Sequence, residues 1–189
     1  NSNKKITDNT INDAISGNLC RCTGYSPIIK AIKSVAYDRI AKNNIQTINK
    51  NKKIKLGNIT YFKPSNLKEL KNYLNDIKDF QFLAGGTDLN LYRPIINQKE
   101  DNIICLDSIK ELNHIKYHKE KIELGGAVTI ENFLEAIKSK MPQLIEILQR
   151  FGSPQIRNQG TIGGNLCTSS PIGDIAPILL VLNSDLKVF

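Results

Sequence analysis

The chain has 189 residues, 40% of them hydrophobic, which suits one substantial packed domain with an appendage. Its formal net charge is +8, but its lysines are scattered and its aromatic content is only 6%, so it lacks the basic stripe with interleaved rings that is typical of nucleic-acid binding. No apolar run approaches the roughly 18 residues of a membrane span, and the N-terminus has no signal-peptide pattern.

Four cysteines are present, at Cys20, Cys22, Cys105 and Cys167. A disulfide framework is typical of short secreted chains, so we expect reduced cysteines and a cytoplasmic location. The sequence begins without Met, and its last four residues, LKVF, alternate in the manner of a strand. We therefore expect a fragment of a longer protein.

Two helices are predicted at the start of the chain, over residues 8–17 and from Ser26-Pro27 to residue 40. Ser26 is a suitable N-cap and Pro27 suits the first helical position. The segment GNLCRCTGY, residues 17–25, then forms a loop between the helices. Two cysteines one residue apart in such a loop predict metal ligands, but they make only half of a four-ligand site.

A polar stretch at 42–57 has no periodicity and predicts a linker. A strand–helix–strand pattern follows, which predicts a βαβ unit with parallel strands. Its strands are expected at 59–62, 80–84 and 102–107, with a helix at 64–77. Farther on we expect a strand at 121–124 and helices at 130–139, 143–151 and 174–182, with a glycine-rich passage before the last helix.

The tetrapeptide Gly85-Gly86-Thr87-Asp88 stands at the carboxyl end of a predicted parallel strand, where α/β sheets bind ligands. Two glycines allow a sharp turn that points several N–H groups at one anion, and a pyrophosphate would suit it. An ordinary strand-to-helix turn is the alternative. The tetrapeptide is not part of a Walker A loop, because no Gly-Lys-Ser/Thr follows it.

A second glycine-rich stretch covers residues 151–165 and continues to Asp174. Its glycines, amides and hydroxyls predict a loop between two apolar helices. Such a loop could approach a flat polar ligand closely, with backbone donors and short side chains meeting the edges of the ligand. Asp174 could cap the last helix or accept hydrogen bonds from ligand hydroxyls. Arg157 could contact a phosphate or only the protein surface.

In this order, the motifs GNLCRCTGYSPII, FLAGGTDL and QIRNQGTIGGN…SPIGD resemble the molybdenum hydroxylase family, most closely its xanthine dehydrogenase-type iron–sulfur and FAD (small) subunit. The resemblance implies an α+β fold. Residues 1–41 would be the C-terminal part of a helical [2Fe–2S] domain, 42–57 a linker, and 58–189 an incomplete FAD-binding domain of the PCMH type. That domain would have a small parallel βαβ part and a larger antiparallel sheet.

The resemblance also implies site residues. Cys20 and Cys22 would be two of the four cluster ligands, while the family's upstream CxxC pair is absent. FAD-binding positions would be Phe82, Leu83, Ala84, Gly85, Gly86, Thr87, Asp88, Leu89, Phe151, Thr161, Ile162, Gly163, Gly164, Asn165 and Asp174. No catalytic general base is expected in this chain. We expect structural roles for Cys105 and Cys167, and no metal site at His114 and His118, which lack a third ligand nearby.

The implied function is electron transfer from purine oxidation through [2Fe–2S] clusters to FAD and then to NAD, within a hetero-oligomer whose large subunit carries molybdopterin. The substrate would be determined by that partner chain. One alternative is the flavin subunit of a related aldehyde, aromatic-acid or carbon monoxide hydroxylase. Another, of a different class, is a non-functional remnant that serves as a scaffold and binds neither cofactor.

Overall fold

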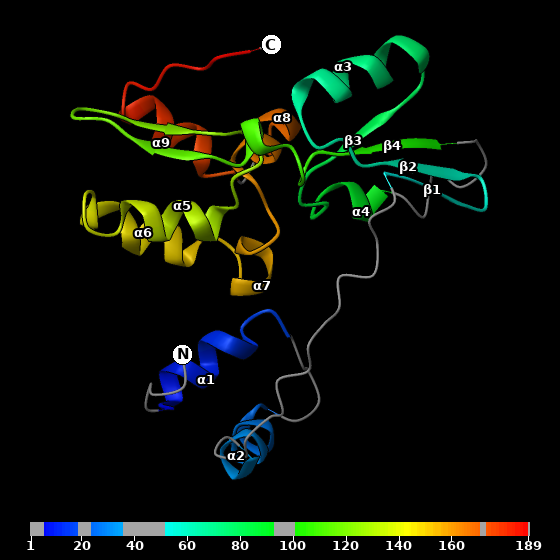
Figure 1. Ribbon diagram of the computed structural model, residues 1–189. Helices are drawn as coiled ribbons and strands as arrows, with labels where there is room; N and C mark the ends of the chain where they lie inside the picture. The colour runs from blue at the N-terminus through cyan, green and yellow to red at the C-terminus, as the bar shows by residue number, and fades with distance from the viewer. Residues whose placement is uncertain (1–5, 19–23, 36–51, 93–100, 171–172, 189) are drawn as a thin grey trace.

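The computed structural model describes residues 6–18, 24–35, 52–92, 101–170 and 173–188 (Figure 1). Its first elements are the helices α1 (Asp8–Ile15) and α2 (Ser26–Val35), joined by an ion pair of 2.6 Å between Lys33 Nζ and Asp8 Oδ1. The prediction of two helices is confirmed. The first ends two residues earlier than expected, Ser26 is already helical rather than an N-cap, and the stretch from 36 to 40 lies outside the described residues.

A four-stranded sheet with the order β1-β2-β4-β3 follows, made of β1 (Lys53–Leu56), β2 (Ile59–Phe62), β3 (Gln81–Leu83) and β4 (Asp101–Cys105). Strand β4 pairs in parallel with β2 and β3, which confirms the predicted βαβ unit. Strand β1 pairs antiparallel with β2, so the linker prediction is wrong for residues 53–56. Residues 42–51 lie outside the described part of the chain.

Helix α3 (Leu67–Asp76) connects β2 to β3 and begins at a dense set of hydrogen bonds. The Asn66 side chain accepts from the Glu69 N–H at 2.8 Å. The Glu69 carboxylate accepts from Lys52 Nζ at 2.7 Å and from the N–H and hydroxyl of Ser65 at 2.8 and 2.9 Å. The hydrogen bonds to the carboxylate lower the pKa of Glu69 from 4.5 to about 2, and the bond from Lys52 has the largest effect.

Replacing Glu69 with Gln should therefore destabilise the protein in a pH-dependent way. Because the folded-state pKa is lowered, the carboxylate's contribution is complete above its ordinary pKa of 4.5 and is lost as the pH falls toward 2. Urea unfolding from about pH 7 down to about pH 3 should show a difference between wild type and Glu69→Gln that narrows below the ordinary pKa. Glu120→Gln, which changes an exposed carboxyl without a described partner, is the control. A difference that does not vary with pH would contradict this account.

The rest of the chain is built from one hairpin and a group of short helices. The hairpin pairs β5 (Ile115–Tyr117) antiparallel with β6 (Ile122–Leu124), and it follows the 3-10 helix η2 (Lys110–Leu112). The helical elements are α5 (Ile130–Ile137), η3 (Pro142–Leu144), α6 (Ile145–Arg150), α7 (Pro154–Arg157), α8 (Ile162–Thr168) and α9 (Ile175–Val181). One hydrophobic cluster holds them together, including the fully buried Ile137, Leu148 and Ile175.

Most predicted elements of this region are confirmed with slightly shorter bounds. The glycine-rich passage was predicted as a loop, but it contains α7 and α8. The larger antiparallel sheet implied by the resemblance is represented, in the described part, by the two-stranded hairpin alone. The predicted terminal strand is also wrong for residues 186–188, which have no regular structure. None of the described helices has the length and apolar character needed to cross a membrane.

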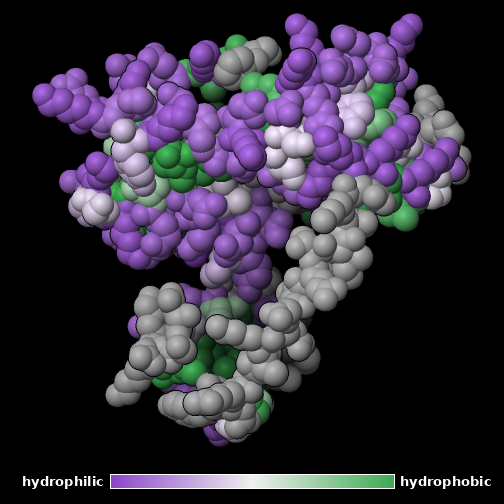
Figure 2. All heavy atoms as spheres, in the orientation of Figure 1, coloured by the Kyte–Doolittle hydropathy of each residue, from purple (hydrophilic) through white to green (hydrophobic). Residues whose placement is uncertain are grey.

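Figure 2 shows a predominantly hydrophilic face over the sheet and the hairpin, with hydrophobic atoms gathered in the region of α1 and α2. Of these two helices, only α1 contributes a buried side chain, Ile11. The pair therefore has little core of its own, and its position depends on what it packs against.

Candidate functional site

Residues 84–89 connect β3 to α4 (Leu89–Tyr92) through the two predicted glycines (Figure 1). Gly86 has a φ of +70°, in the left-handed region that favours glycine. Gly85 lies against the turn before α8, because a Cβ atom on it would be 1.8 Å from the Gln159 carbonyl oxygen. The structure therefore brings the two glycine-rich motifs, which are far apart in the sequence, into direct contact.

The backbone N–H groups of residues 84–89 donate no hydrogen bond to any other described residue. The next two N–H groups do donate, that of Asn90 to the Gly86 carbonyl and that of Leu91 to the Asp88 carbonyl. Successive free N–H groups in a glycine turn are an arrangement that binds phosphate oxygens. Thr87, within this turn, adds a hydroxyl that lies close to Gly160. This part of the site fits a pyrophosphate.

The first turn of α8 is different, because its N–H groups are already occupied. The N–H of Ile162 donates to the Val128 carbonyl at 3.0 Å, and that of Gly163 donates to the Gly126 carbonyl at 2.8 Å. The side chain of Thr161, which is buried, accepts from the Gly164 N–H at 3.0 Å. The expectation that this segment offers backbone donors to a ligand is therefore wrong for Ile162, Gly163 and Gly164. These bonds instead fix α8 on the turn at 125–129.

Asn165 and Asp174 lie close together at the other end of this region. The Asn165 Oδ1 atom is buried without a hydrogen-bond partner among the described residues. A Cβ atom on Gly173 would be 3.0 Å from it, so the start of α9 passes directly beside Asn165. Asp174 occupies the N-cap position of α9, yet its exposed carboxylate makes no capping hydrogen bond. Side-chain capping is thus not its role here, and the carboxylate is open to a ligand.

The two aromatic positions have different surroundings. Phe82 on β3 is 47% exposed and makes an edge contact with Phe80, with ring centroids 5.1 Å apart. Phe151 is half-buried and packs against the hydrophobic cluster of the short helices. A flat ligand could stack on Phe82, whereas Phe151 has at least a packing role.

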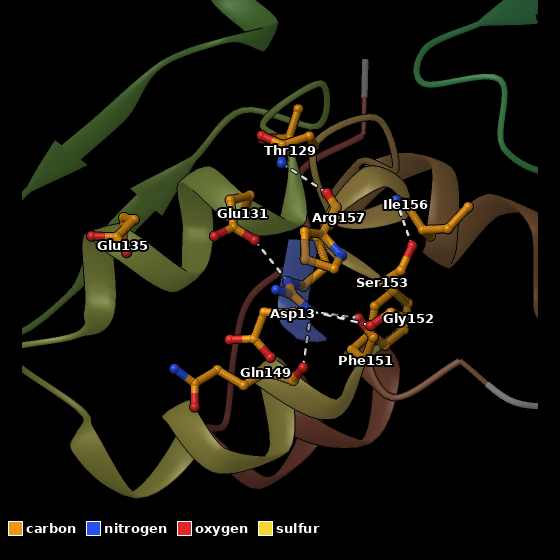
Figure 3. Close-up of polar contacts among 12 residues, drawn as sticks. Asp13, Thr129, Glu131, Glu135, Gln149, Phe151, Gly152, Ser153, Ile156 and Arg157 are labelled. Atoms are coloured by element: carbon orange, nitrogen blue, oxygen red, sulfur yellow. Dashed lines mark hydrogen bonds and ion pairs between the residues drawn. The ribbon is translucent and has the colours of Figure 1, made fainter. Parts of the chain in front are cut away.

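Arg157 is buried at the centre of a hydrogen-bond network (Figure 3). Its Nε donates to Glu131 Oε2 at 2.7 Å. Its Nη1 donates to the carbonyls of Gln149 at 2.8 Å, Gly152 at 3.1 Å and Phe151 at 3.5 Å. The sequence left the role of Arg157 open between a phosphate contact and a surface position, whereas in the structure its side chain is buried and bonded to the protein itself. Nothing in the sequence pairs it with Glu131.

The predicted metal ligands Cys20 and Cys22 lie outside the described residues. Within the part of the chain that is described, no group of three His, Cys, Asp or Glu side chains could hold a metal ion. His114 Nε2 and His118 Nε2 lie 2.7 and 3.7 Å from the carboxylate oxygens of Glu123 on the hairpin. Cys105 is half-buried and burial raises the pKa of its thiol, which agrees with a structural role.

Comparison with known proteins gives two family matches. One family, described as the FAD binding domain in molybdopterin dehydrogenase, matches residues 53–189. Another, described as a [2Fe-2S] binding domain, matches residues 1–33. The match that begins at residue 53 agrees with the start of β1.

Several curated proteins are similar to this chain. Abscisic-aldehyde oxidase of Arabidopsis thaliana is 26% identical and is matched over 97% of this chain and 17% of its own length. The FAD-subunit of nicotinate dehydrogenase from Eubacterium barkeri is 39% identical, over 66% of this chain and 43% of its own length. Xanthine dehydrogenases of Arabidopsis thaliana and Rattus norvegicus are 22–24% identical over 94–99% of this chain.

Among solved structures, carbon monoxide dehydrogenase from Hydrogenophaga pseudoflava has a similar fold, with a TM-score of 0.57 and 25% identity. The similarity covers 62% of this chain and 42% of that chain. The chain thus spans less than half the length of each of these relatives. Because the first family match alone covers well over half of the residues, the chain belongs to the family of FAD-binding domains of molybdopterin dehydrogenases.

Proposed function

We propose that this chain is the FAD-binding part, together with a portion of the iron–sulfur part, of the electron-transfer subunit of a molybdenum hydroxylase. The observation that carries the proposal is the glycine turn at 84–89, with free N–H groups, held against the second glycine-rich motif by Gly85. When bound, FAD would supply the redox chemistry, while the residues of this chain would bind and orient it.

The turn at 84–88 is proposed to hold the FAD pyrophosphate, with Thr87 as an additional donor. Asp174 would accept a hydrogen bond from a hydroxyl of FAD, and the Asn165 amide would contribute beside it. Phe151 would lie near the flavin ring, and Phe82 would belong to the segment that holds the pyrophosphate. The remaining predicted positions, Leu83, Leu89, Thr161, Ile162, Gly163 and Gly164, would form the wall of the site and fix its shape.

Cys20 and Cys22 are proposed as two of four ligands of a [2Fe–2S] cluster. The family match over residues 1–33 supports this assignment. A cluster of the ferredoxin type requires four cysteine ligands, so two more would have to come from outside the described residues. Cys105 and Cys167 are unsuited to that task, because Cys105 is half-buried with a raised pKa and Cys167 follows the second glycine motif.

The substrate class is proposed from the arrangement of the segments. Relatives of the xanthine dehydrogenase and aldehyde oxidase types match nearly the whole chain, whereas the nicotinate and carbon monoxide dehydrogenase proteins match about two thirds of it. The fusion of a cluster segment to a flavin domain therefore favours the first group. We propose purine oxidation with NAD as acceptor, in the cytoplasm, with molybdopterin on a large partner subunit. An aldehyde substrate is the second candidate.

Replacing Asp174 with Ala should test the flavin site without disturbing the fold. Because Asp174 makes no capping bond, the free energy of unfolding should change by less than about 0.5 kcal/mol. Loss of a charge-assisted hydrogen bond should weaken FAD binding about tenfold. FAD titration of the deflavinated complete subunit, followed by flavin fluorescence, measures the affinity.

Asp185→Ala is the matched control, since it removes another exposed carboxylate from the segment after α9. Its FAD affinity should equal that of wild type. Full affinity in Asp174→Ala would remove Asp174 from the site. A complete wild-type subunit that binds no flavin would refute the proposed function and favour the scaffold alternative.

A further inference from the structure

We propose that the turn formed by residues 151–157 is the docking surface on which α1, the first helix of the cluster-binding segment, is held against the flavin domain. The proposal concerns contacts within the protein and does not depend on FAD being bound. In Figure 1, α1 and α7 lie next to each other, although they are far apart in the sequence.

A hydrogen bond forms the first half of the contact. Gln155 Nε2 donates to the Ala14 carbonyl oxygen at 2.6 Å. Ala14 is in the last turn of α1, where carbonyl groups have no partner within the helix. A side-chain amide is well suited to this position, because it satisfies a helix-end carbonyl without adding a charge.

A close approach of Gly17 to two side chains of the turn forms the second half. A Cβ atom on Gly17 would lie 2.7 Å from Gln155 Oε1 and 2.7 Å from Ser153 Oγ. A side chain at Gly17, two positions after the end of α1, would have to displace the Gln155 amide and the Ser153 side chain. Gln155 contributes to both halves, since its Nε2 reaches Ala14 while its Oε1 lies beside Gly17.

The turn has a rigid base, which makes it suitable for docking. Arg157 binds the carbonyls of Phe151 and Gly152 from inside, and the Ser153 side chain accepts from the Ile156 N–H at the start of α7 (Figure 3). Pro154 restricts the backbone at the first helical position. The outer face, which carries Ser153 and Gln155, is thus fixed relative to the flavin domain.

A contact of this size would be too weak between separate molecules, but here both sides belong to one chain. The covalent link between the two sides gives an effective concentration of about the millimolar range, so docking requires a contact free energy of only about 4 kcal/mol. The Gln155 hydrogen bond contributes about 1 kcal/mol of this. Gly17 precedes Cys20 by three positions in the sequence. Docking of α1 would therefore fix Asn18, the last described residue before the cysteines, relative to the flavin domain.

Hydrogen–deuterium exchange of the assembled enzyme tests the proposal through the amides of α1. In Gln155→Glu the donor is replaced by an oxygen that repels the Ala14 carbonyl, so a peptide covering residues 6–18 should exchange about three to ten times faster. Exchange in α5 and the flavin content should stay at wild-type values, because the Gln155 side chain is exposed and its described hydrogen bond goes to Ala14 and not to α5. Gln143→Glu, the same substitution at an exposed site in η3, should leave α1 unchanged.

Gly17→Leu places a large side chain on the α1 side of the same contact, against Gln155 and Ser153. It should also accelerate hydrogen–deuterium exchange in α1. The double variant should exchange no faster than the more affected single variant, because both changes break one contact. If Gly17→Leu fails to assemble, Gln155→Glu decides the question, since it alters only an exposed side chain. Wild-type exchange of α1 in Gln155→Glu would overturn the proposal, and so would a parallel increase in α5, which would mean that Gln155 stabilises the flavin domain itself.

Discussion

Replacing Gly85 with Ala is expected to lower the affinity of the complete subunit for FAD about tenfold. The new Cβ atom would lie 1.8 Å from the Gln159 carbonyl oxygen, 2.5 Å from its carbon and 3.0 Å from the Gly160 nitrogen. These are backbone atoms that cannot rotate away, so the turn at 84–89 would have to move off the second glycine motif. Forced shifts of this kind cost about 1–3 kcal/mol, and 1.4 kcal/mol already corresponds to a tenfold change in affinity.

Gly126→Ala is the matched control for this substitution. A Cβ atom on Gly126 would be 3.8 Å from Gly163 Cα, an ordinary contact, and Gly126 does not have a positive φ. Its FAD affinity and melting temperature should stay close to those of wild type. The affinity for FAD is measured by titration of the deflavinated subunit. If Gly85→Ala bound FAD as tightly as wild type, the contact between the two motifs would not shape the flavin site.

The elements that could be predicted from the sequence are those with a regular pattern of apolar residues. Helices α3, α5 and α9 and the strands β2 and β4 were predicted at nearly their observed positions. Strand β1 was not, because its lysines at 53 and 55 resemble a polar linker. It is an edge strand of the sheet, where exposed lysines are common, and only its pairing with β2 defines it.

The conformation of the second glycine motif could not be predicted, because long-range contacts determine it. The N–H of Gly163 binds the Gly126 carbonyl, and Thr161 forms a bridge with Thr129. The sequence contains the glycines but not the information that they meet another glycine about forty positions earlier. For this reason the motif was expected to offer its backbone N–H groups to a ligand, although the protein itself uses them.

Arg157 illustrates the same limit for a charged side chain. Arginine is rarely buried without a partner, and its partners here are one carboxylate on α5 and three carbonyls near the end of α6. The side chain is 10% exposed and that of Glu131 is 27% exposed. Neither the pairing nor the burial follows from the residues around position 157, because no acidic residue stands near it in the sequence.

Replacing Arg157 with Met should cost about 3–5 kcal/mol of the free energy of unfolding, because it leaves a partly buried carboxylate and three carbonyls without their donor. Arg157→Lys should lose less of the free energy of unfolding than Arg157→Met but still be less stable than wild type. A single ammonium group cannot reach all four acceptors in their fixed geometry. Glu131→Gln should cost less than Arg157→Met, because an amide oxygen can still accept from Nε and the carbonyls keep their donor. Urea unfolding of the three variants gives this order.

Arg150→Met is the control that separates a buried network from a surface ion pair. Arg150 pairs with Glu146 one turn away on α6, and both side chains are more than 70% exposed. Its loss should cost no more than about 0.5 kcal/mol. If Arg157→Met were no more destabilising than Arg150→Met, the network would not hold the 151–157 turn, and the docking surface for α1 would lose its rigid base. A loss several times larger than in the control, accompanied by faster exchange of α1 in the milder Arg157→Lys, is the result that the geometry predicts.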